Sequence, residues 1–243
     1  MTKSIKKIAF VVTLGTLLSK SGGLLRQLVI AGAFGISAAY DAYNYAYIIP
    51  GFFFVLLGGI NGPLHNSMVT LLAKKNKVES KLFLNSINTL LTILLLILTI
   101  FVFFSSDLLI QLVGPNLNPE LKEIASSQLK IMSPIILISG LVGISFGSLN
   151  AKNEFLIPSI SPLISSVVII IAVSNFWITK ENTVDPYLLN IKGGVILAKA
   201  TFIGALSQYL IQIPFLIKKG IFDISFSITT KYSEIKRAFR MIA

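Results

Sequence analysis

Long apolar runs, separated by short polar segments, make up most of this chain. Six of these runs approach or exceed the ~20 residues that an α-helix needs to cross the hydrocarbon core of a bilayer. The pattern therefore predicts an all-α, polytopic membrane protein with six transmembrane helices, over residues 8–34, 42–61, 82–104, 124–149, 156–177 and 193–216. A shorter helix is expected from Pro63 to Leu72, because proline is favoured at the first helical position.

Prolines and polar segments predict where these helices bend or end. Pro50 and Pro134 lie inside the second and fourth runs, where a proline removes one backbone hydrogen bond and crowds the preceding turn. We expect a kink at each. The proline-containing segment 105–123 is expected to be a loop. Near the end of the chain, apolar residues recur at helical spacing beside cations and predict a basic amphipathic helix, at Ile235, Ala238, Phe239 and Ile242.

Composition supports a membrane protein and excludes several functional classes. Of the 243 residues, 54% are hydrophobic and 13% are charged, whereas soluble domains carry roughly a quarter charged residues. The net charge of +11 does not indicate nucleic-acid binding, because the cations lie in short segments between apolar runs and not along one helical face. Without cysteine there is no disulfide or thiolate metal site. The single histidine, His65, is expected to be a polar residue near a membrane boundary.

The distribution of lysine and arginine predicts the orientation. If the amino terminus is inside and the six runs alternate, fourteen cations fall in inside segments and three fall outside, the three being Lys122, Lys180 and Lys192. Cytoplasmic segments of membrane proteins carry such an excess of positive charge. The sequence therefore predicts a multi-pass protein of the plasma membrane with both ends of this chain in the cytoplasm.

The first run carries two charges that need an explanation. Lys20 and Arg26 lie well inside it, and a charge at bilayer depth usually faces a bundle interior or a wet cavity, because lipid exposure costs about 3 kcal/mol or more. Gly22 and Gly23 lie between them and predict a hinge. In a straight helix the two cations would stand about 120° apart, so a bend could direct both into one cavity. The alternative is that both side chains extend to the interface.

The turn that follows the first run carries an acid. Asp41 precedes the second run, where it can form the mouth of a cavity or act as the N-cap of the next helix. Three tyrosines follow at positions 43, 45 and 47. Tyrosine at this depth is typical of an interfacial belt, and Tyr43 and Tyr47 share one helical face.

The sequence lacks the residue constellations of an enzyme. It contains no paired carboxylates at membrane depth, no P-loop, no G-x-S-x-G elbow and no histidine spacing that would bind a metal. No cofactor is predicted, and no coupling ion is identified. The remaining chemistry is a cationic cavity beside glycine and proline breaks, which favours holding an anionic group without transforming it.

Two stretches of the sequence resemble a known family. Residues 19–50 (SKSGGLLRQLVIAGAFGISAAYDAYNYAYIIP) and 128–166 (QLKIMSPIILISGLVGISFGSLNAKNEFLIPSISPLISS) resemble the MurJ/MviN lipid II flippases of peptidoglycan synthesis, within the multidrug/oligosaccharidyl-lipid/polysaccharide exporter superfamily. The resemblance implies fourteen helices in two six-helix lobes plus two. Residues 1–217 would then be the amino-terminal lobe, and residues 218–243 the connector into a carboxy-terminal lobe that this chain lacks.

The resemblance also implies roles for individual residues. The family's cavity cations fall on Lys20 and Arg26, and its mouth acid falls on Asp41. Lys20 stands where arginine is usual, so the charge is kept and the bidentate fork is lost. On the second helix, where many members have two arginines and then an acid before a glycine, this chain has Phe54, Val55 and Gly59.

The function that this resemblance implies is transport. The chain would be half of a flippase that moves undecaprenyl-diphosphate-linked peptidoglycan precursor outward across the bacterial plasma membrane by alternating access. Its partners would be lipid II, membrane lipids and the missing lobe, with no nucleic acid. Two alternatives remain at this point, namely an exporter of another lipid-linked glycan and a membrane fragment or scaffold without transport activity.

Overall fold

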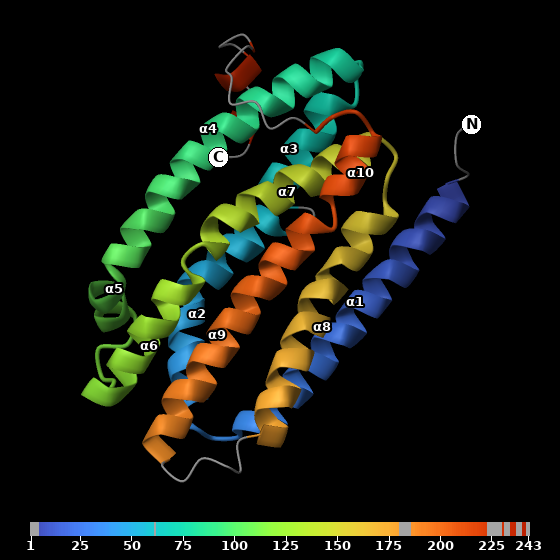
Figure 1. Ribbon diagram of the computed structural model, residues 1–243. Coiled ribbons are helices and arrows are strands. Elements are labelled where there is room, and N and C mark those ends of the chain that lie inside the picture. The colour runs from blue at the N-terminus through green and yellow to red at the C-terminus, as the bar shows by residue number, and fades with distance from the viewer. Residues whose placement is uncertain are drawn as a thin grey trace.

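The computed structural model describes residues 5–60, 62–179, 186–222, 230, 234–236 and 240–241. These residues form helices joined by short turns (Figure 1). In chain order the helices are α1 (Ile5–Phe34), α2 (Ala38–Gly58), α3 (Pro63–Leu72), α4 (Lys77–Phe104), α5 (Ser106–Val113), α6 (Pro119–Met132), α7 (Ile135–Ala151), α8 (Leu156–Thr179), α9 (Pro186–Leu210) and α10 (Ile213–Lys218).

Six stretches of the described helices are long and apolar enough to cross a membrane. Three of them consist of a single helix, namely α1, α4 and α8. The other three each join two consecutive helices, which are α2 with α3, α6 with α7 and α9 with α10. The all-α fold and the six spans predicted from the apolar pattern are therefore confirmed.

The fourth and sixth spans each consist of two helices, whereas the sequence predicted one continuous helix for each. The fourth span is broken at Pro134, since α6 ends at Met132 and α7 begins at Ile135. A proline that cannot donate a backbone hydrogen bond favours such a break. The sixth span is divided in the same way between Leu210 and Ile213. Pro50, in contrast, lies inside α2, which runs as one helix past it.

The segment 105–123 contains a helix that the sequence analysis assigned to a loop. Helix α5 occupies Ser106–Val113 and ends at Gly114, where the backbone leaves the helical conformation. Its buried residues, Ser106 and Ile110, face α6. The two prolines of the segment come after α5, so they permit this helix, and Pro119 begins α6 at its first turn.

The end of the chain is described only in part. The predicted amphipathic helix falls largely outside the described residues, which include Ile235, a buried residue in a short helical turn. Beside it, the Glu234 carboxylate forms an ion pair with Lys75 Nζ at 2.8 Å. The division into a lobe of residues 1–217 and a connector of residues 218–243 remains a prediction.

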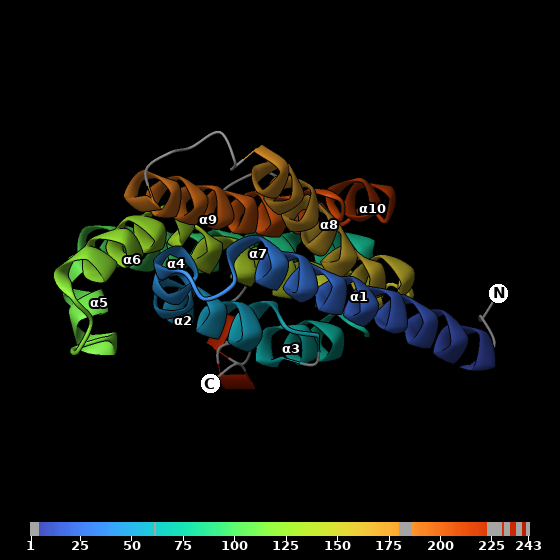
Figure 2. The same cartoon turned by 90° about the horizontal axis from the view of Figure 1, so that it is seen from below.

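Helix α7 lies at the centre of the bundle. It packs against α2, α3, α4 and α9, and Figure 2 shows it between the layer that holds α9 and the helices α2 and α3. Two glycines allow neighbours to approach its backbone closely. A Cβ at Gly143 would contact the Leu57 carbonyl oxygen, and a Cβ at Gly147 would lie 2.6 Å from the Met68 Cβ. Helices pack tightly in membranes where such small residues form the contact.

Helix α1 lies at the edge of the bundle and packs mainly on α8. Figures 1 and 2 show it extending along α8 and away from the remaining helices at its start. A Cβ at Gly15 would lie 2.8 Å from the Ser159 Cβ, and the Ser19 hydroxyl donates to the Ser159 carbonyl oxygen at 2.6 Å. The contact therefore relies on small and polar residues on the shared face.

Lysine side chains close several helix ends at one end of the molecule, which we call the lysine-rich end and define by Lys74, Lys75, Lys77, Lys152, Lys218 and Lys219. The Lys152 ammonium donates to the Lys75 carbonyl oxygen at 2.8 Å, just beyond the end of α3. Lys219 donates to the Lys152 carbonyl oxygen at 3.0 Å and pairs with the Glu154 carboxylate at 3.5 Å. Burial lowers the pKa of the Lys152 ammonium. These bonds satisfy carbonyl groups that helix ends leave without partners.

Candidate functional site

A cavity of about 330 Å³ lies between α1, α2, α8 and α9. Residues of all four helices line it, together with one residue of α7. The lining residues are Ser19, Gly23, Arg26, Gln27, Ile30, Tyr40, Tyr43, Asn44, Tyr47, Phe54, Ile135, Pro162, Ser165, Ser166, Ile169, Thr201, Ala205 and Gln208. The cavity thus presents hydroxyl, amide and aromatic groups together with one guanidinium group.

Arg26 is the one charged residue among those that line this cavity. Its side chain is partly buried, and it forms no ion pair with any described residue. A guanidinium group carries a positive charge and offers five donors in a planar fork, and no described carboxylate occupies those donors here. The cavity is therefore electrostatically suited to an anion such as a phosphate.

Three tyrosines of α2 stack opposite Arg26. The ring centroids of Tyr40 and Tyr43 lie 6.2 Å apart, and those of Tyr43 and Tyr47 lie 5.5 Å apart, with nearly parallel planes. Tyr43 and Tyr47 share a helical face, as their spacing predicts. The assignment of Tyr43 to an interfacial belt was wrong, because its side chain is buried and lines the cavity.

A hydrogen bond joins this tyrosine stack to α9. The Tyr43 hydroxyl oxygen lies 3.1 Å from Thr201 Oγ1, and the Thr201 hydroxyl donates its proton to the Leu197 carbonyl oxygen at 2.8 Å. Since a threonine hydroxyl has one proton, Tyr43 is the donor in its bond to Thr201. The tyrosine rings are thereby held in a fixed orientation across the base of the cavity.

Lys20 lines a neighbouring cavity of about 700 Å³. Ser19 and Pro162 line both cavities, so the two adjoin at this point. Lys20 is exposed, and it faces the second cavity and not the first. The structure therefore places the two predicted cations in adjacent cavities on one uninterrupted helix, and not in the single cavity that a bend at Gly22 and Gly23 would have created.

The predicted hinge at Gly22 and Gly23 lies inside an uninterrupted helix. A Cβ at Gly22 would contact the Leu163 side chain, so this glycine allows α1 and α8 to approach closely. A Cβ at Gly23 would have no neighbour within 4 Å, because this residue opens onto the cavity. Their role as a hinge remains a prediction.

Asp41 is not the N-cap of α2, which was one of its two predicted roles. The N-cap is Ser37, whose hydroxyl oxygen accepts a hydrogen bond from the Tyr40 backbone N–H at 3.4 Å. Asp41 lies in the first helical turn, where a carboxylate interacts favourably with the helix dipole. Its side chain is exposed and does not line the Arg26 cavity. Its role at a cavity mouth remains a prediction.

The positions where this chain departs from the family pattern lie in different surroundings. Phe54 lines the Arg26 cavity near Tyr47, whereas Val55 is exposed on the outer surface of α2. Gly59 is the C-cap of α2. Of these three positions, only Phe54 can contact a molecule held in the cavity.

Two features of the site were missed from the sequence. Gln27 and Asn44 line the cavity, but they resemble ordinary polar residues near helix ends. On α9, Thr201, Ala205 and Gln208 follow the i, i+4, i+7 spacing of one helical face and line the cavity together. This spacing was a usable signal within an apolar run.

His65 was expected to be a polar residue near a membrane boundary, but it is 6% exposed. Its Nε2 lies 2.7 Å from Asn150 Nδ2, and its Nδ1 lies 3.2 Å from Asn66 Oδ1. Because an amide nitrogen donates, Nε2 accepts and the proton is on Nδ1. His65 therefore joins α3 to α7. Among the described residues, no group of three or more histidine, cysteine, aspartate or glutamate side chains could hold a metal ion.

Comparison with known proteins gives a consistent result. The family model described as "Lipid II flippase MurJ" matches residues 30–243. A probable lipid II flippase MurJ of Synechocystis sp. is 43% identical over 222 residues, which cover 90% of this chain and 41% of that protein. The lipid II flippase MurJ of Thermosipho africanus is 32% identical over 185 residues, covering 76% of this chain and 38% of that protein.

A solved structure shows the same arrangement of helices. The structure titled "Lipid II flippase MurJ, inward closed conformation" superposes with a TM-score of 0.74 at 26% identity, covering 96% of this chain and 46% of that one. This chain spans about two fifths of the length of the curated relatives it matches. The resemblance read from residues 19–50 and 128–166 is confirmed. The chain belongs to the MurJ family of lipid II flippases.

Proposed function

We propose that this chain forms the amino-terminal lobe of a lipid II flippase, which moves a polyprenyl-diphosphate-linked peptidoglycan precursor across the plasma membrane. The observation that carries the proposal is the Arg26 cavity, where a guanidinium group that forms no ion pair with any described residue lies among hydroxyl, amide and aromatic side chains. The family membership and the six spans support the same function.

The cavity chemistry fits a diphosphate with a polar headgroup. Arginine binds phosphate oxygens through two parallel N–H···O bonds, and such charge-assisted bonds are roughly twice as strong as neutral ones. Asn44, Thr201 and Gln208 offer polar groups nearby for sugar and peptide. Because the cavity lacks a carboxylate that could act as an acid or base, the site suits binding and release without a chemical step.

Transport by alternating access needs a second half. In transporters of this kind, the substrate site lies near the midplane between two repeats that rock against each other. Here α1, which carries Arg26, packs mainly on α8. The rest of its surface is therefore open to contact with a second lobe. The relatives are more than twice as long as the matched region, and we assign the opposing wall to their second half.

The lysine-rich end supports a cytoplasmic position for the amino terminus and the end of α10. The start of α1, the turn between α3 and α4, and the end of α10 lie together at this end (Figure 1). Its six defining lysines follow the positive-inside pattern. Transport of the precursor would then run from this end toward the opposite end, which carries the turns at residues 35–37 and 114–118.

Substitution of Arg26 in the complete protein tests the proposal. Arg26→Ala should reduce delivery of lipid II to the outer leaflet at least ~100-fold, with normal abundance, whereas Arg26→Lys should retain part of it because charge survives and the fork does not. Lys218→Ala, which removes an exposed cation outside the cavity, is the matched control and should transport normally. Normal transport by Arg26→Ala at wild-type abundance would contradict the diphosphate site.

A further inference from the structure

Two lysines on α9 lie on the face opposite the Arg26 cavity. At about 100° per residue, the cavity-lining residues Thr201, Ala205 and Gln208 stand about 180° to 240° around the helix from Lys199. Lys192 stands only about 20° from Lys199, one heptad earlier. Both lysines are exposed. They belong to an outer stripe of α9 that continues through the exposed residues Ile203 and Leu210.

Lys199 lies within the membrane-spanning part of this helix. The span begins at Ile191, so Lys199 follows it by eight residues, or about 12 Å along the axis. Helical side chains lean toward the amino-terminal end of their helix, which for α9 is the nearer interface. A long lysine side chain on such a stripe extends its ammonium group toward the headgroups. Lys192 lies about 10 Å closer to that interface.

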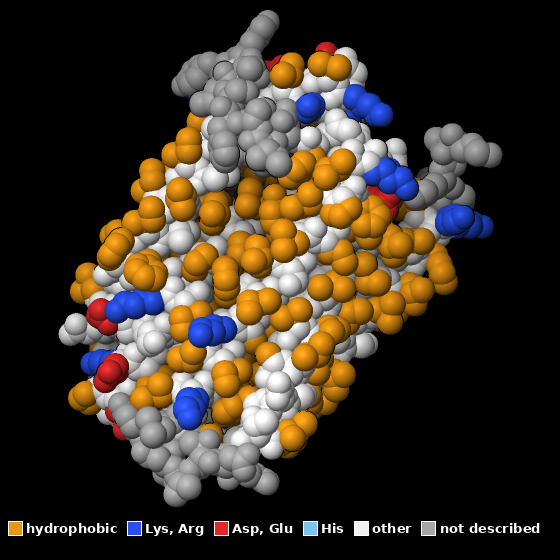
Figure 3. Space-filling model, viewed as in Figure 1, with side chains coloured by type: hydrophobic (Ala, Val, Ile, Leu, Met, Phe, Trp, Pro, Cys, Tyr) orange, Lys and Arg blue, Asp and Glu red, His pale blue; other side chains and the backbone are white. Residues whose placement is uncertain are grey.

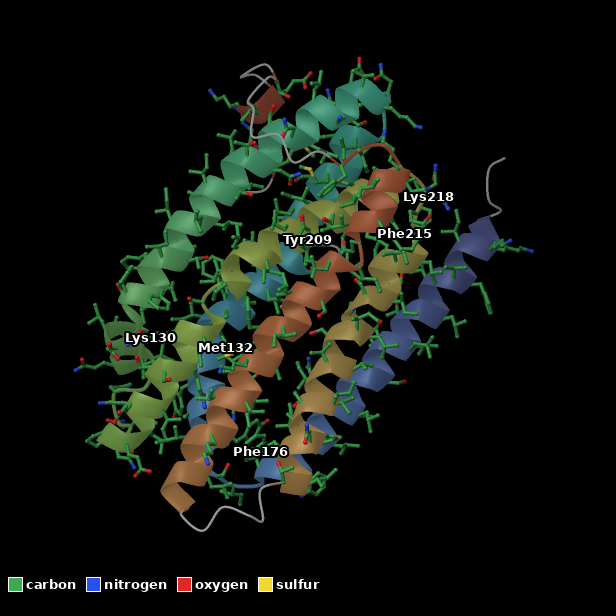
Figure 4. The ribbon with its side chains drawn as sticks, in the orientation of Figure 1. Lys130, Met132, Phe176, Tyr209, Phe215 and Lys218 are labelled. Atoms are coloured by element: carbon green, nitrogen blue, oxygen red, sulfur yellow. The ribbon has the colours of Figure 1, made fainter. Side chains whose placement is uncertain are left out.

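The two ammonium groups lack an anionic partner within the described part of the chain. Neither forms an ion pair or hydrogen bond with another described residue. On α6, which packs against α9, Glu123 lines a small cavity with Ile191 and Val195 and forms no ion pair with a described residue. The Asp107 carboxylate on α5 is bonded to Lys130 at 3.2 Å, and Figure 4 shows Lys130 on α6, on the side toward α5. The surface around α9 is mostly hydrophobic, with basic side chains at separate places (Figure 3).

We propose that Lys192 and Lys199 bind the phosphate of an anionic phospholipid in the leaflet at the opposite end from the lysine-rich end. A lipid places its phosphate at the two ammonium groups and its acyl chains against Ile203, one helical turn beyond Lys199. Basic residues near the membrane surface attract anionic lipid with about a fivefold gain for each lysine. The site is separate from the Arg26 cavity and does not depend on the proposed transport function.

A site-specific lipid probe tests this proposal. These 243 residues contain no cysteine, so Ile203→Cys, in a complete protein whose remaining cysteines are replaced by serine, gives one attachment point for a fluorophore on the same stripe. The complete protein is reconstituted in nanodiscs with brominated phosphatidylglycerol or brominated phosphatidylcholine, and quenching gives the preference for the anionic lipid. We expect a clear preference for phosphatidylglycerol, falling about fivefold for each lysine removed in Lys192→Gln and Lys199→Gln.

Three controls make the result decisive. Lys77→Gln with Lys218→Gln removes the same charge at the lysine-rich end, where Figure 4 shows Lys218, and should preserve the preference. Lys192→Arg with Lys199→Arg should also preserve it. Quenching by phosphatidylcholine should persist in every variant if the stripe still faces lipid. Equal quenching by the two lipids in the protein that keeps both lysines would overturn the proposal. Loss of the preference on adding inorganic phosphate would also contradict it, since the site would then be a general anion site.

Discussion

Helix α1 and the α6–α7 segment are both apolar enough to cross a membrane, but they differ greatly in burial. In the most apolar part of α1, 11% of the residues are buried, whereas the corresponding value for Pro119–Ala151 is 72%. Helix α1 presents Phe10, Leu17 and Leu24 outward, while α7 packs mainly against α2, α3, α4 and α9. Hydrophobicity therefore identifies a span, but packing partners decide whether it is a central or a peripheral helix.

Small residues explain much of this difference. Lipid is as apolar as leucine, so helices associate in membranes through close packing and polar contacts. Gly143 and Gly147 give α7 such contacts. On α1, Gly22 makes the same kind of contact with α8, but Gly23 opens onto the cavity. At two successive residues, α1 therefore has one glycine packed against α8 and one that opens onto the cavity.

The same substitution at two glycines should have opposite effects, and this is the largest effect we expect. Gly143→Ala places a methyl group against the Leu57 backbone and should destabilise the protein by about 3 kcal/mol, the upper part of the range for overpacking. Gly23→Ala meets open space and should stabilise it by about 0.5–1 kcal/mol, because alanine favours helix. Thermal unfolding in detergent measures both.

Gly23→Ala also tests the predicted hinge. If Gly23 serves only to open the cavity, the variant should transport at close to the normal rate. If the helix must bend there, transport should fall while stability rises. Equal stability of Gly143→Ala and the unmodified protein would contradict the comparison between α7 and α1.

A smaller effect is expected at α5, which is attached to the bundle through polar contacts. The Ser126 hydroxyl and the Lys130 ammonium hold the pKa of the Asp107 carboxyl below its usual value. A depressed folded-state pKa contributes stability above the unfolded value of about 3.9, and this stability is lost as pH falls toward the folded value.

Asp107→Asn should therefore lower the free energy of unfolding at pH 7 by no more than about 0.5 kcal/mol, since the carboxylate is largely exposed and screened. The difference between variant and unmodified protein should shrink as pH falls below about 4 and vanish once Asp107 is protonated. Chemical denaturation at pH 7 and pH 3 checks this. A difference that grows on acidification would show that the pair does not stabilise α5.

The sequence predicted the spans well because each is defined by its own residues. Apolar runs give length and limits, and Pro134 marked the right position even though it breaks the span where a kink was expected. Helix α5 was missed because eight residues between polar segments are too few for a periodic signal. The sequence left open whether Asp41 caps α2 or lies at a cavity mouth, because capping depends on backbone angles. The structure has Ser37 as the N-cap.

The site was predictable only in part. Arg26 stood out because a charge inside an apolar run needs a polar environment. The tyrosine stack and the bond from Tyr43 to Thr201 join residues 158 positions apart, and no local pattern reports such a contact. The separation of Lys20 and Arg26 into adjacent cavities likewise depends on where α8 and α2 pack.

The central claim is that α1 carries a wet cavity face beside a lipid face, and labelling of single cysteines tests it most directly. Gly23→Cys and Leu24→Cys are adjacent substitutions in a stretch of 243 residues without cysteine, and any cysteine in the rest of the complete protein is replaced by serine. Gly23 lines the cavity and Leu24 is 65% exposed. A water-soluble thiol reagent should modify the complete protein at position 23 at least ~10-fold faster than at position 24, because a thiolate forms readily only in water. Added lipid II should slow the reaction at position 23. Equal rates at the two positions, or faster labelling at position 24, would contradict the account.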